Sequence, residues 1–281
     1  MHTGDGQPNL QGPAASFWAD ALAQWAVPEE ILAAAPESPW GFPTALFVQN
    51  ARRALEGPPT PTHRRVAEAL PEAGVLLDVG AGAGAASLPV APRDGRLVAL
   101  DQHREMLTAL ADLARSLDRT FDLELVEGKW PDTAHEVATV DVALCANVAY
   151  NVADVSTFLT ALTNAARHRV VVELSASHPQ SPLSPLWQHF WGLNRPDRPT
   201  ADDAIAVVRE VIGVAPGVER WQRRSSFMGE RGPDTANWVR QRLCLPPARE
   251  PEVATSLGRM GDLAPPEAVT LWWSGGASVR Q

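Results

Sequence analysis

The sequence predicts an α/β protein with a mostly parallel sheet and helices on both faces of that sheet. Five short apolar runs alternate with amphipathic helical patterns, as βαβ units require. These runs are residues 75–79, 97–101, 123–126, 140–145 and 170–174. A glycine-rich turn follows the first run, and an acidic residue, Asp101, closes the second. Together these features indicate a nucleotide-binding βαβ unit.

The composition is that of an ordinary globular protein. Of the 281 residues, 45% are hydrophobic and 20% are charged, which suits one large α/β domain with an appendage or two small domains. The net charge of −9 argues against a nucleic-acid partner, which would need a basic stripe. We expect no membrane span and a cytoplasmic enzyme, because no run approaches 18 apolar residues and no basic segment leads into an apolar run at the amino terminus.

Cysteine and metal-binding patterns are sparse. Cys145 and Cys244 are the two cysteines, so the sequence provides no disulfide framework, and Cys145 is expected in a buried strand. No CxxC or HExxH spacing occurs, so we expect no metal site.

Two segments precede the predicted sheet. Residues 1–14 are rich in glycine, proline and polar side chains, which predicts a disordered tail. Residues 15–61 are expected to form a helical cover with helices that open at Ser16, Pro28 and Thr44.

An aromatic segment at residues 39–43 is flanked by prolines within this cover. Trp40 and Phe42 either anchor the helices by packing or form a lid over a ligand, and the sequence leaves both possibilities open. A helix over residues 66–70, capped by Thr62, then leads into the core.

The glycine-rich turn after the first strand has features of a ligand-binding loop. Gly80, Gly82 and Gly84 permit φ > 0 and leave no Cβ between the main chain and a ligand. A helix is expected to begin near Gly84, so that its free N–H groups face the crevice at the carboxyl end of the strand. Asp101 lies 19 residues after Gly82, where a strand-end carboxylate accepts the ribose hydroxyls of an adenosine.

The identity of the nucleotide depends on Asp78. Gly80, Gly82 and Ala85 also fit the dinucleotide pattern in which the third residue is small. A carboxylate at position 78 would repel a pyrophosphate, whereas it would attract a ligand that carries an ammonium and a sulfonium group.

The arrangement Asp78-x-Gly-x-Gly-x-Gly84, followed by Asp101, resembles the class I methyltransferases, which use S-adenosylmethionine. Residues 127–130 match the end of the third strand and the adenine-flanking loop of that family, and residues 141–150 match the fourth strand and its loop. Lys129 stands where many members carry an acid or its amide. Because a lysine cannot accept a hydrogen bond from the adenine amine, we expect the main chain or a neighbouring side chain to recognise that amine.

The resemblance implies a Rossmann-like fold with a seven-stranded sheet. It implies an S-adenosylmethionine-binding core at residues 62–175, and residues 176–281 would supply substrate-side insertions and complete the sheet. The cofactor-binding residues that it implies are Asp78, Gly80, Ala81, Gly82, Gly84, Asp101, Gln102, Met106, Gly128, Lys129, Trp130, Asn147 and Val148. The implied reaction is SN2 transfer of the sulfonium methyl group to a small, partly apolar molecule.

Candidate catalytic residues follow the fourth and fifth strands. Tyr150 lies in the loop that faces the methyl group in the resembling enzymes, where it either orients a substrate or bonds to the backbone. His178 and His189 are candidate general bases, because histidine titrates near neutral pH. His189 belongs to an aromatic run at residues 185–192, which either lines a substrate pocket or packs its tryptophans into the core and leaves His189 exposed.

The remaining elements complete the prediction. Expected helices span residues 106–117, 155–166, 201–212, 238–243 and 253–260, and the sixth and seventh strands span residues 218–223 and 268–273. The long connection between these last two strands indicates an added cap or a dimer contact.

Two alternatives remain open. An NAD(P)-dependent oxidoreductase is supported by the glycine pattern, but Asp78 and the lack of a Tyr-x-x-x-Lys pair argue against it. A non-catalytic member of the methyltransferase fold, which binds the cofactor or has lost it, is supported by the weak base candidates. The sequence does not determine the methyl acceptor or the oligomeric state.

Overall fold

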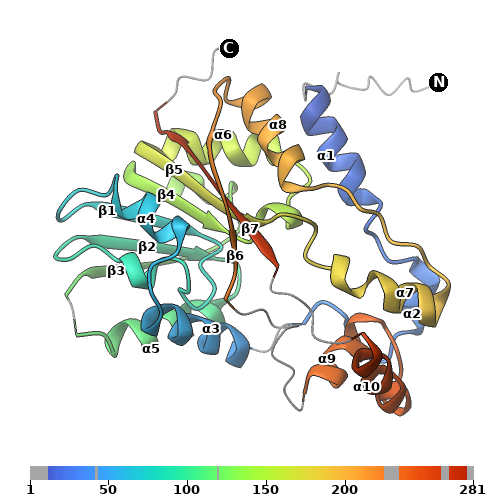
Figure 1. Ribbon diagram of the computed structural model, residues 1–281. Coiled ribbons are helices and arrows are strands. Elements are labelled where there is room, and N and C mark those ends of the chain that lie inside the picture. The colour runs from blue at the N-terminus through green and yellow to red at the C-terminus, as the bar shows by residue number, and fades with distance from the viewer. Residues whose placement is uncertain (1–11, 42–43, 119, 225–233, 261–265, 277–281) are drawn as a thin grey trace, which may run out of the picture.

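The computed structural model describes residues 12–41, 44–118, 120–224, 234–260 and 266–276. Within them the chain forms a seven-stranded sheet in the order β3-β2-β1-β4-β5-β7-β6, with helices on both faces (Figure 1). The predicted fold class and the seven strands are therefore confirmed.

The strands are β1 (Val75–Val79), β2 (Arg96–Asp101), β3 (Asp122–Glu127), β4 (Val140–Ala146), β5 (Ala166–Ser175), β6 (Gly217–Gln222) and β7 (Glu267–Ser274). The first five strands pair in parallel, whereas β7 runs antiparallel to both β5 and β6. The central strands β1 and β4 are apolar and buried on both faces, as expected for parallel strands covered by helices. Asp78 is the one charged residue within β1.

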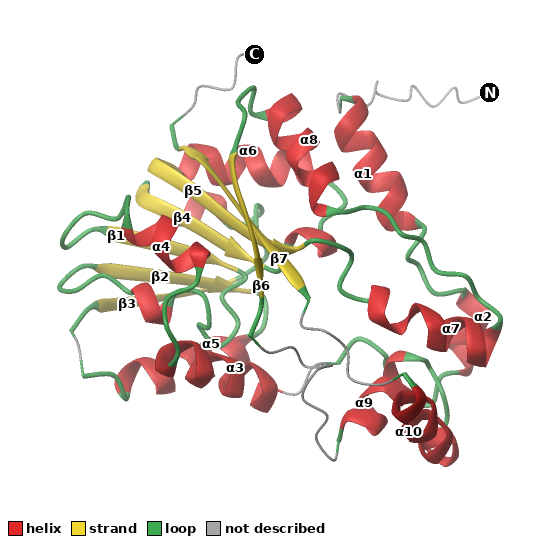
Figure 2. Ribbon diagram, in the orientation of Figure 1, coloured by secondary structure: helices red, strands yellow, loops and turns green. Residues whose placement is uncertain are grey.

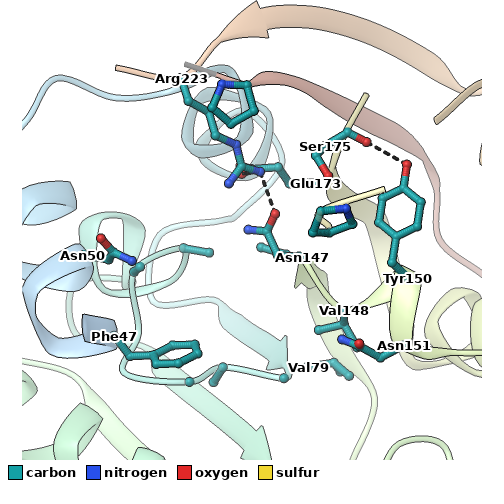
Figure 3. Close-up of a pocket in the computed structure, with 18 of the residues that line it drawn as sticks. Phe47, Asn50, Val79, Asn147, Val148, Tyr150, Asn151, Glu173, Ser175 and Arg223 are labelled. Carbon is teal, nitrogen blue, oxygen red and sulfur yellow. Dashed lines mark hydrogen bonds and ion pairs between the residues drawn. The ribbon is translucent and has the colours of Figure 1, made fainter. Parts of the chain in front are cut away.

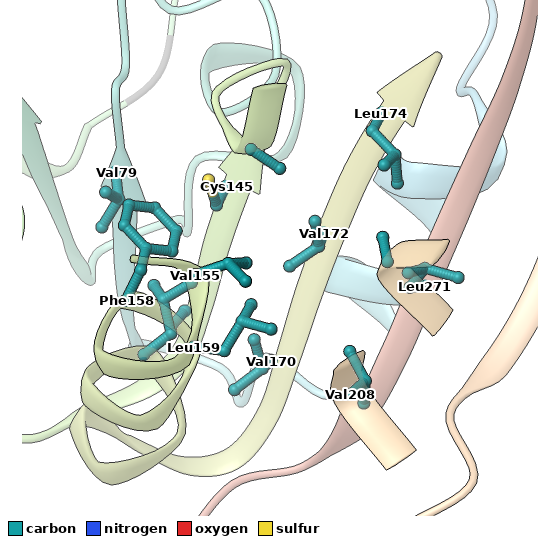
Figure 4. Close-up of a cluster of buried hydrophobic side chains, with 14 of the residues drawn as sticks. Val79, Cys145, Val155, Phe158, Leu159, Val170, Val172, Leu174, Val208 and Leu271 are labelled. Atoms are coloured by element: carbon teal, nitrogen blue, oxygen red, sulfur yellow. The ribbon is translucent and has the colours of Figure 1, made fainter. Parts of the chain in front are cut away.

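The α-helices of the described part of the chain are α1 (Pro13–Ala23), α2 (Glu29–Ala34), α3 (Thr44–Glu56), α4 (Pro61–Ala67), α5 (Arg104–Arg115), α6 (Val155–Ala165), α7 (Ser184–Trp191), α8 (Ala201–Val211), α9 (Thr235–Arg242) and α10 (Glu250–Arg259). Helices α1, α6 and α8 cover one face of the sheet, and α3, α4 and α5 cover the other (Figure 2). Buried side chains of β4, β5, α6 and α8 meet in the first of these cores (Figure 4).

Four helices form a separate unit, which we call the helical cap: α2, α7, α9 and α10. They share their own apolar core, in which Trp187 is fully buried. The aromatic run at residues 185–192 therefore packs into this core rather than facing a pocket. No helix in the described part of the chain combines the length and the apolar character that a membrane span requires.

The start of α1 differs from the prediction. The helix begins at Pro13, three residues before Ser16, because a distant side chain caps it. The carboxylate of Glu210, on α8, accepts hydrogen bonds from the N–H groups of Ala14 (2.9 Å) and Ala15 (3.1 Å). A long-range cap of this kind leaves no local signal. Residues 1–11 of the predicted tail lie outside the described residues.

The cap of α4 was also predicted wrongly. Thr60, not Thr62, is the N-cap, since its hydroxyl accepts from the N–H of His63 and Pro61 occupies the first helical turn. Thr62 is instead buried, and its hydroxyl donates to Glu173 at 2.6 Å.

The helix expected after the glycine-rich turn does not form. Residues 80–95, all of them described, contain turns and the three-residue 3-10 helix η1 (Leu88–Val90) but no α-helix. One helical hydrogen bond, from the N–H of Leu88 to Gly84, is present at 2.9 Å. Pro89 and Pro92 lack the N–H groups that would continue the ladder. The expected row of helix N–H groups facing the crevice is therefore absent.

Candidate active site

A cavity of about 2100 Å³ lies at the carboxyl ends of the parallel strands. Loops after β1 to β5 line it, together with parts of α1, α3 and α4. A site for one small ligand is usually roughly 300–1,000 Å³, so this cavity has room for two ligands side by side.

The structure brings most of the predicted residues together. The lining includes Asp78, Gly80, Ala81, Gly82, Asp101, Gln102, Met106, Gly128, Lys129, Trp130, Asn147, Val148 and Tyr150. Gly84 and His189 are not part of it. A Cβ at Gly84 would lie 2.6 Å from Leu88 Cγ, so this glycine serves the packing of η1.

Asp78 is a buried carboxylate at the centre of the sheet. Its side chain is 1% exposed, and neither oxygen has a hydrogen-bond partner among the residues that the structure describes. Burial raises the pKa of Asp78 to about 7, and the charge of Asp101 adds to that rise, while the nearby Ser87 hydroxyl opposes it. A carboxylate without a partner is costly to bury, and a cationic ligand in the cavity would supply the missing partner.

The glycine loop is closed over by two other elements. Gly80 has φ +72°, and a Cβ there would lie 2.4 Å from Val148 Cγ2 in the loop after β4. Gly82 has φ +52°, and a Cβ there would lie 3.2 Å from Phe47 Cδ1 on α3. Figure 3 shows the Phe47 ring beside this loop, with Val148 further along the cavity wall. Val148 and Phe47 can therefore pack this closely against the loop only because both positions are glycine.

Asp101 is fixed by main-chain donors at the end of β2. One carboxylate oxygen accepts from the N–H of Gly82 at 2.8 Å, and the other accepts from the N–H of His103 at 2.9 Å. Each carboxylate oxygen keeps a second lone pair for a hydroxyl of a ligand. The same hydrogen bonds tie the glycine loop to β2, so the position of the loop depends on Asp101.

The part of the cavity next to β3 has buried apolar side chains, and Lys129 is an exposed charge beside them. Met106 and Trp130 are 6% and 5% exposed, and the indole N–H of Trp130 donates to the carbonyl of Phe158 at 3.3 Å. The N–H of Gly128 donates to the carbonyl of Asp101 at 3.0 Å. Lys129 is exposed, so its side chain lies at the rim.

Tyr150 is held in place by its neighbours. Its hydroxyl donates to the carbonyl of Ser175 at 2.8 Å (Figure 3), and its ring stacks on Trp18 with centroids 5.4 Å apart. Burial raises the pKa of the Tyr150 hydroxyl. The hydroxyl is therefore neutral at physiological pH, and it donates its proton to a backbone carbonyl. This agrees with the alternative in which Tyr150 bonds to the backbone rather than orienting a substrate.

His178 lines the cavity in a neutral form. Its ring stacks on Trp25 at 3.8 Å, and Nδ1 accepts from the N–H of Gln180 at 3.3 Å. Burial, with a contribution from the charge of Arg195, lowers the pKa of His178 to about 4. Nε2 therefore carries the ring proton and can donate a hydrogen bond, and the lowered pKa makes the ring a weak base.

The structure places His189 far from this chemistry. It lies exposed on α7, with its ring edge against Phe190 at 4.7 Å. The apolar face of α7 packs into the helical cap, and the polar position of His189 is turned out of it. The expectation that His189 serves as a general base is therefore not supported by its location.

Trp40 lies in the cavity wall and is 50% exposed, so it is not buried as a packing anchor. Phe42, the other aromatic residue of the proline-flanked segment, lies outside the described residues.

A polar network that the sequence did not predict lies beyond β4 and β5. Arg223 Nη2 donates to Glu173 at 2.9 Å and to the side-chain oxygen of Asn147 at 2.6 Å (Figure 3). Thr62 donates to the other oxygen of Glu173. Glu173 could have been noticed as an acid near the end of a parallel strand, as Asp78 and Asp101 are, but no sequence signal links it to Arg223.

Comparison with known proteins gives the family of the central region. Residues 77–172, which run from β1 into β5, match a family model described as a methyltransferase domain. No curated protein sequence matches the chain.

Solved structures share the fold at low sequence identity. A methyltransferase from Bacillus halodurans C-125 is 13% identical, with a TM-score of 0.50, and the match covers 75% of this chain and 96% of that one. A structure described by the conversion of a disulfide bond into a thioacetal group during echinomycin biosynthesis is 15% identical, with a TM-score of 0.51, covering 84% and 94%. A methyltransferase from Thiobacillus denitrificans, in complex with S-adenosyl-L-homocysteine, is 18% identical, with a TM-score of 0.48, covering 83% and 99%.

The fold and the cavity define a Rossmann-like protein whose ligands bind at the carboxyl ends of a parallel sheet. The family-model match then identifies residues 77–172 as a methyltransferase domain, and the solved structures share its fold. The protein is a methyltransferase, and the resemblance stated from the sequence is confirmed.

Proposed function

We propose that the protein transfers the methyl group of S-adenosylmethionine to a small, partly apolar acceptor that is already nucleophilic when it binds. The observation that carries the proposal is Asp78, a buried carboxylate without a partner in the wall of a cavity large enough for two ligands. S-adenosylmethionine supplies an electrophilic methyl group on a sulfonium, and its positive charges match this unpaired carboxylate.

The chain's own residues divide the binding of the cofactor between them. Asp78 supplies the counter-charge, Asp101 accepts the ribose hydroxyls, and Gly80 and Gly82 allow close approach of the main chain. The remaining proposed cofactor contacts are Ala81, Gln102, Met106, Gly128, Lys129, Trp130, Asn147 and Val148. Residues 62–175 form the cofactor-binding region in this proposal, and residues 15–61 and 176–281 supply the acceptor side.

The histidines of the acceptor side are poor bases. The Nδ1 atom of His63 accepts from the N–H of Thr60 at 3.2 Å, and burial lowers the pKa of His63. His178 is held neutral in the same manner. Catalysis then consists mainly of aligning the acceptor with the methyl group and excluding water. Such a site suits an acceptor atom that needs no deprotonation, such as an ionised oxygen, a thiolate or an amine.

Aromatic side chains line the outer part of the cavity and support a partly apolar acceptor. They include Trp25, Trp40, Trp221 and Trp238. Indole rings provide large apolar contact areas that fit planar ligands.

Calorimetric titration of the purified protein with S-adenosylmethionine, S-adenosylhomocysteine and NADH tests the proposal. We expect micromolar binding of the two adenosyl ligands and no binding of NADH. Binding of NADH alone would replace the proposal with the oxidoreductase alternative.

A second assay distinguishes an enzyme from a protein that binds the cofactor without catalysis. The lack of a good base is also consistent with the second of these. Radiolabelled methyl transfer is measured with a panel of small carboxylic acids, phenols, thiols and amines. Tight cofactor binding without transfer to any acceptor in the panel would favour the non-catalytic protein.

A further inference from the structure

We propose that Arg223 binds an anionic oxygen, a carboxylate or a phenolate, on a planar aromatic methyl acceptor. The inference rests on the proposed function, because it assigns a chemical class to the acceptor of the same cavity. Arg223 is then an acceptor-binding residue, and Glu173 and Asn147 are the residues that position it.

The guanidinium of Arg223 is held firmly but uses few of its donors. Its Nη2 atom donates to Glu173 Oε1 at 2.9 Å and to Asn147 Oδ1 at 2.6 Å. Its Nε atom is buried and has no hydrogen-bond acceptor. No hydrogen bond joins Nη1 to any residue in the described part of the chain. A guanidinium carries five N–H donors. Two of them are used at Nη2 and the Nε donor is covered by the protein, so the two donors of Nη1, which have no partner among the described residues, remain for a ligand.

Glu173 is itself satisfied by the protein. Its Oε2 atom accepts from Thr62 at 2.6 Å, and Thr62 is in hydrogen-bond contact with Thr270 at 2.7 Å. Trp221 donates to the Thr270 hydroxyl at 3.0 Å. Because the Thr62 proton goes to Glu173, Thr270 donates to Thr62, and every donor in this series points toward the carboxylate. Glu173 therefore acts as a fixed support for Arg223 rather than as a group awaiting a ligand.

The order of the strands places Arg223 on the acceptor side of the cavity. Asp101 ends β2 and the proposed adenosine site lies toward β3, whereas Arg223 directly follows β6 at the opposite edge of the sheet. Asn147, which follows β4, lies between them. Figure 3 shows Arg223 and Asn147 facing the space opposite Phe47, which marks the glycine loop.

The charges of the cavity are segregated in the same way. On the acceptor side, Glu219 pairs with Arg64 and Arg65, Glu267 pairs with Arg220, and Glu173 pairs with Arg223. Among the buried carboxylates of the described residues, Asp78, on the cofactor side, is without a partner. A cationic cofactor at Asp78 and an anionic acceptor at Arg223 would each meet a complementary charge.

An aromatic wall lies next to the free donors. Trp221 and Arg223 are two residues apart, and the alternation along β6 turns both toward the partly buried face. Both residues line the cavity. An aryl ring against Trp221 would direct an attached carboxylate or phenolate oxygen toward the Arg223 guanidinium, and planar anions of this kind suit the donor fork of arginine.

The test uses benzoate as the anionic probe and benzamide as its neutral match. Binding of each is measured by protein NMR titration up to millimolar concentrations, with the protein saturated by S-adenosylhomocysteine. The variants are Arg223→Gln and Arg223→Lys, with Arg220→Gln, three residues earlier on β6, as a control of equal charge change. Arg220 contacts Asp202 and Glu267 and does not line the cavity.

We expect benzoate to bind in preference to benzamide. Arg223→Gln should weaken the binding of benzoate at least about tenfold and abolish the preference for benzoate over benzamide. Arg223→Lys should keep part of that preference. Arg220→Gln should leave the affinities for benzoate and benzamide unchanged. Thermal unfolding of each variant confirms that it is folded.

Three results would overturn the assignment. The wild-type protein could fail to bind benzoate, or Arg223→Gln could bind it as the wild type does. Alternatively, Arg223→Gln could lose affinity for S-adenosylhomocysteine itself, which would assign the guanidinium to the carboxylate of the cofactor. Failure of the proposed function is a separate result, since the wild-type protein would then not bind the adenosyl ligands at all.

Discussion

The two halves of the cavity are built in different ways. The cofactor half comes from β1, β2, β3 and the loops that follow them. Its key carboxylates, Asp78 and Asp101, lie on the paired strands β1 and β2, and main-chain N–H groups hold Asp101. The acceptor half is assembled from α1, α4, β5, β6 and the segment after β5. Its central ion pair joins Glu173 to Arg223, 50 positions apart.

The halves also differ in how their charges are satisfied. Asp78 makes no hydrogen bond with any described residue, so the cofactor half keeps an electrostatic cost that a cation can remove. In the acceptor half, Glu173 and Tyr150 bond to the protein itself. The comparison teaches that the cofactor half leaves a carboxylate for a charged ligand, whereas the acceptor half binds its carboxylate and its tyrosine to the protein and leaves donors of Arg223 for a ligand.

The largest expected effect concerns the unpaired charge of Asp78. Its pKa is raised to about 7 in the folded protein from 3.8, so the stability that it contributes is complete below pH 3.8 and is lost as the pH rises through 7. Between pH 5 and pH 8 the free energy of unfolding of the ligand-free protein should fall by about 3 kcal/mol from this group. Asp78→Asn should remove that loss, as urea unfolding at both pH values would reveal.

The same substitution should weaken the binding of S-adenosylmethionine, because Asp78 is proposed to balance the positive charge of this cofactor. Calorimetry near pH 7 in buffers of different ionisation enthalpy should show proton release on binding to the wild-type protein, because the cation lowers the pKa of Asp78. If the free energy of unfolding depended on pH in the same way for the wild type and Asp78→Asn, Asp78 would not carry the unpaired charge that distinguishes the cofactor half.

The next effect concerns Asp101, which links β2 to the glycine loop. Asp101→Ala removes the proposed ribose contacts and the hydrogen bond from Gly82, so the affinity for S-adenosylhomocysteine should fall about 100-fold, or about 2.7 kcal/mol. Asp112→Ala, at an exposed position of α5, is the matched control. Calorimetric affinities within twofold of each other for the two variants would contradict the role of Asp101.

A smaller effect is expected from the long-range cap of α1. Glu210→Ala leaves the first N–H groups of that helix without their acceptor and should cost about 1–2 kcal/mol in urea unfolding. The binding of S-adenosylhomocysteine should stay unchanged, because α1 contacts the acceptor half through Trp18 and Tyr150. Arg209→Ala, at the preceding exposed position, is the control. A loss of affinity for S-adenosylhomocysteine as large as the loss of stability would show that the two halves are coupled.

The smallest effect is expected at Tyr150. Tyr150→Phe removes the hydrogen bond to Ser175 but keeps the stacking on Trp18, so the free energy of unfolding should fall by about 1 kcal/mol. Methyl transfer to an acceptor found in the panel assay should fall only a few-fold. A folded Tyr150→Phe protein that binds cofactor normally but has no activity would instead make Tyr150 a catalytic residue.

The sequence determined the strand pattern, the sheet class and the residues that line the cofactor half. These depend on local physics: alternation of apolar runs with amphipathic helices, glycines at positions of positive φ, and a carboxylate at the end of the next strand. The carboxyl ends of neighbouring parallel strands meet at one edge, so Asp78, Asp101 and Asn147 are brought together by the topology alone.

Only the tertiary structure decided the rest. Packing of α7 into the helical cap, rather than any property of histidine, removed His189 from the site. Glu210, on the distant helix α8, extended α1. The missing helix after β1 is different, because Pro89 and Pro92 are a local signal that the sequence already contained. The pairing of Glu173 with Arg223 and the neutral state of His178 depend on contacts between distant segments and on burial. A one-dimensional pattern encodes neither property, because both arise only when separate elements pack together.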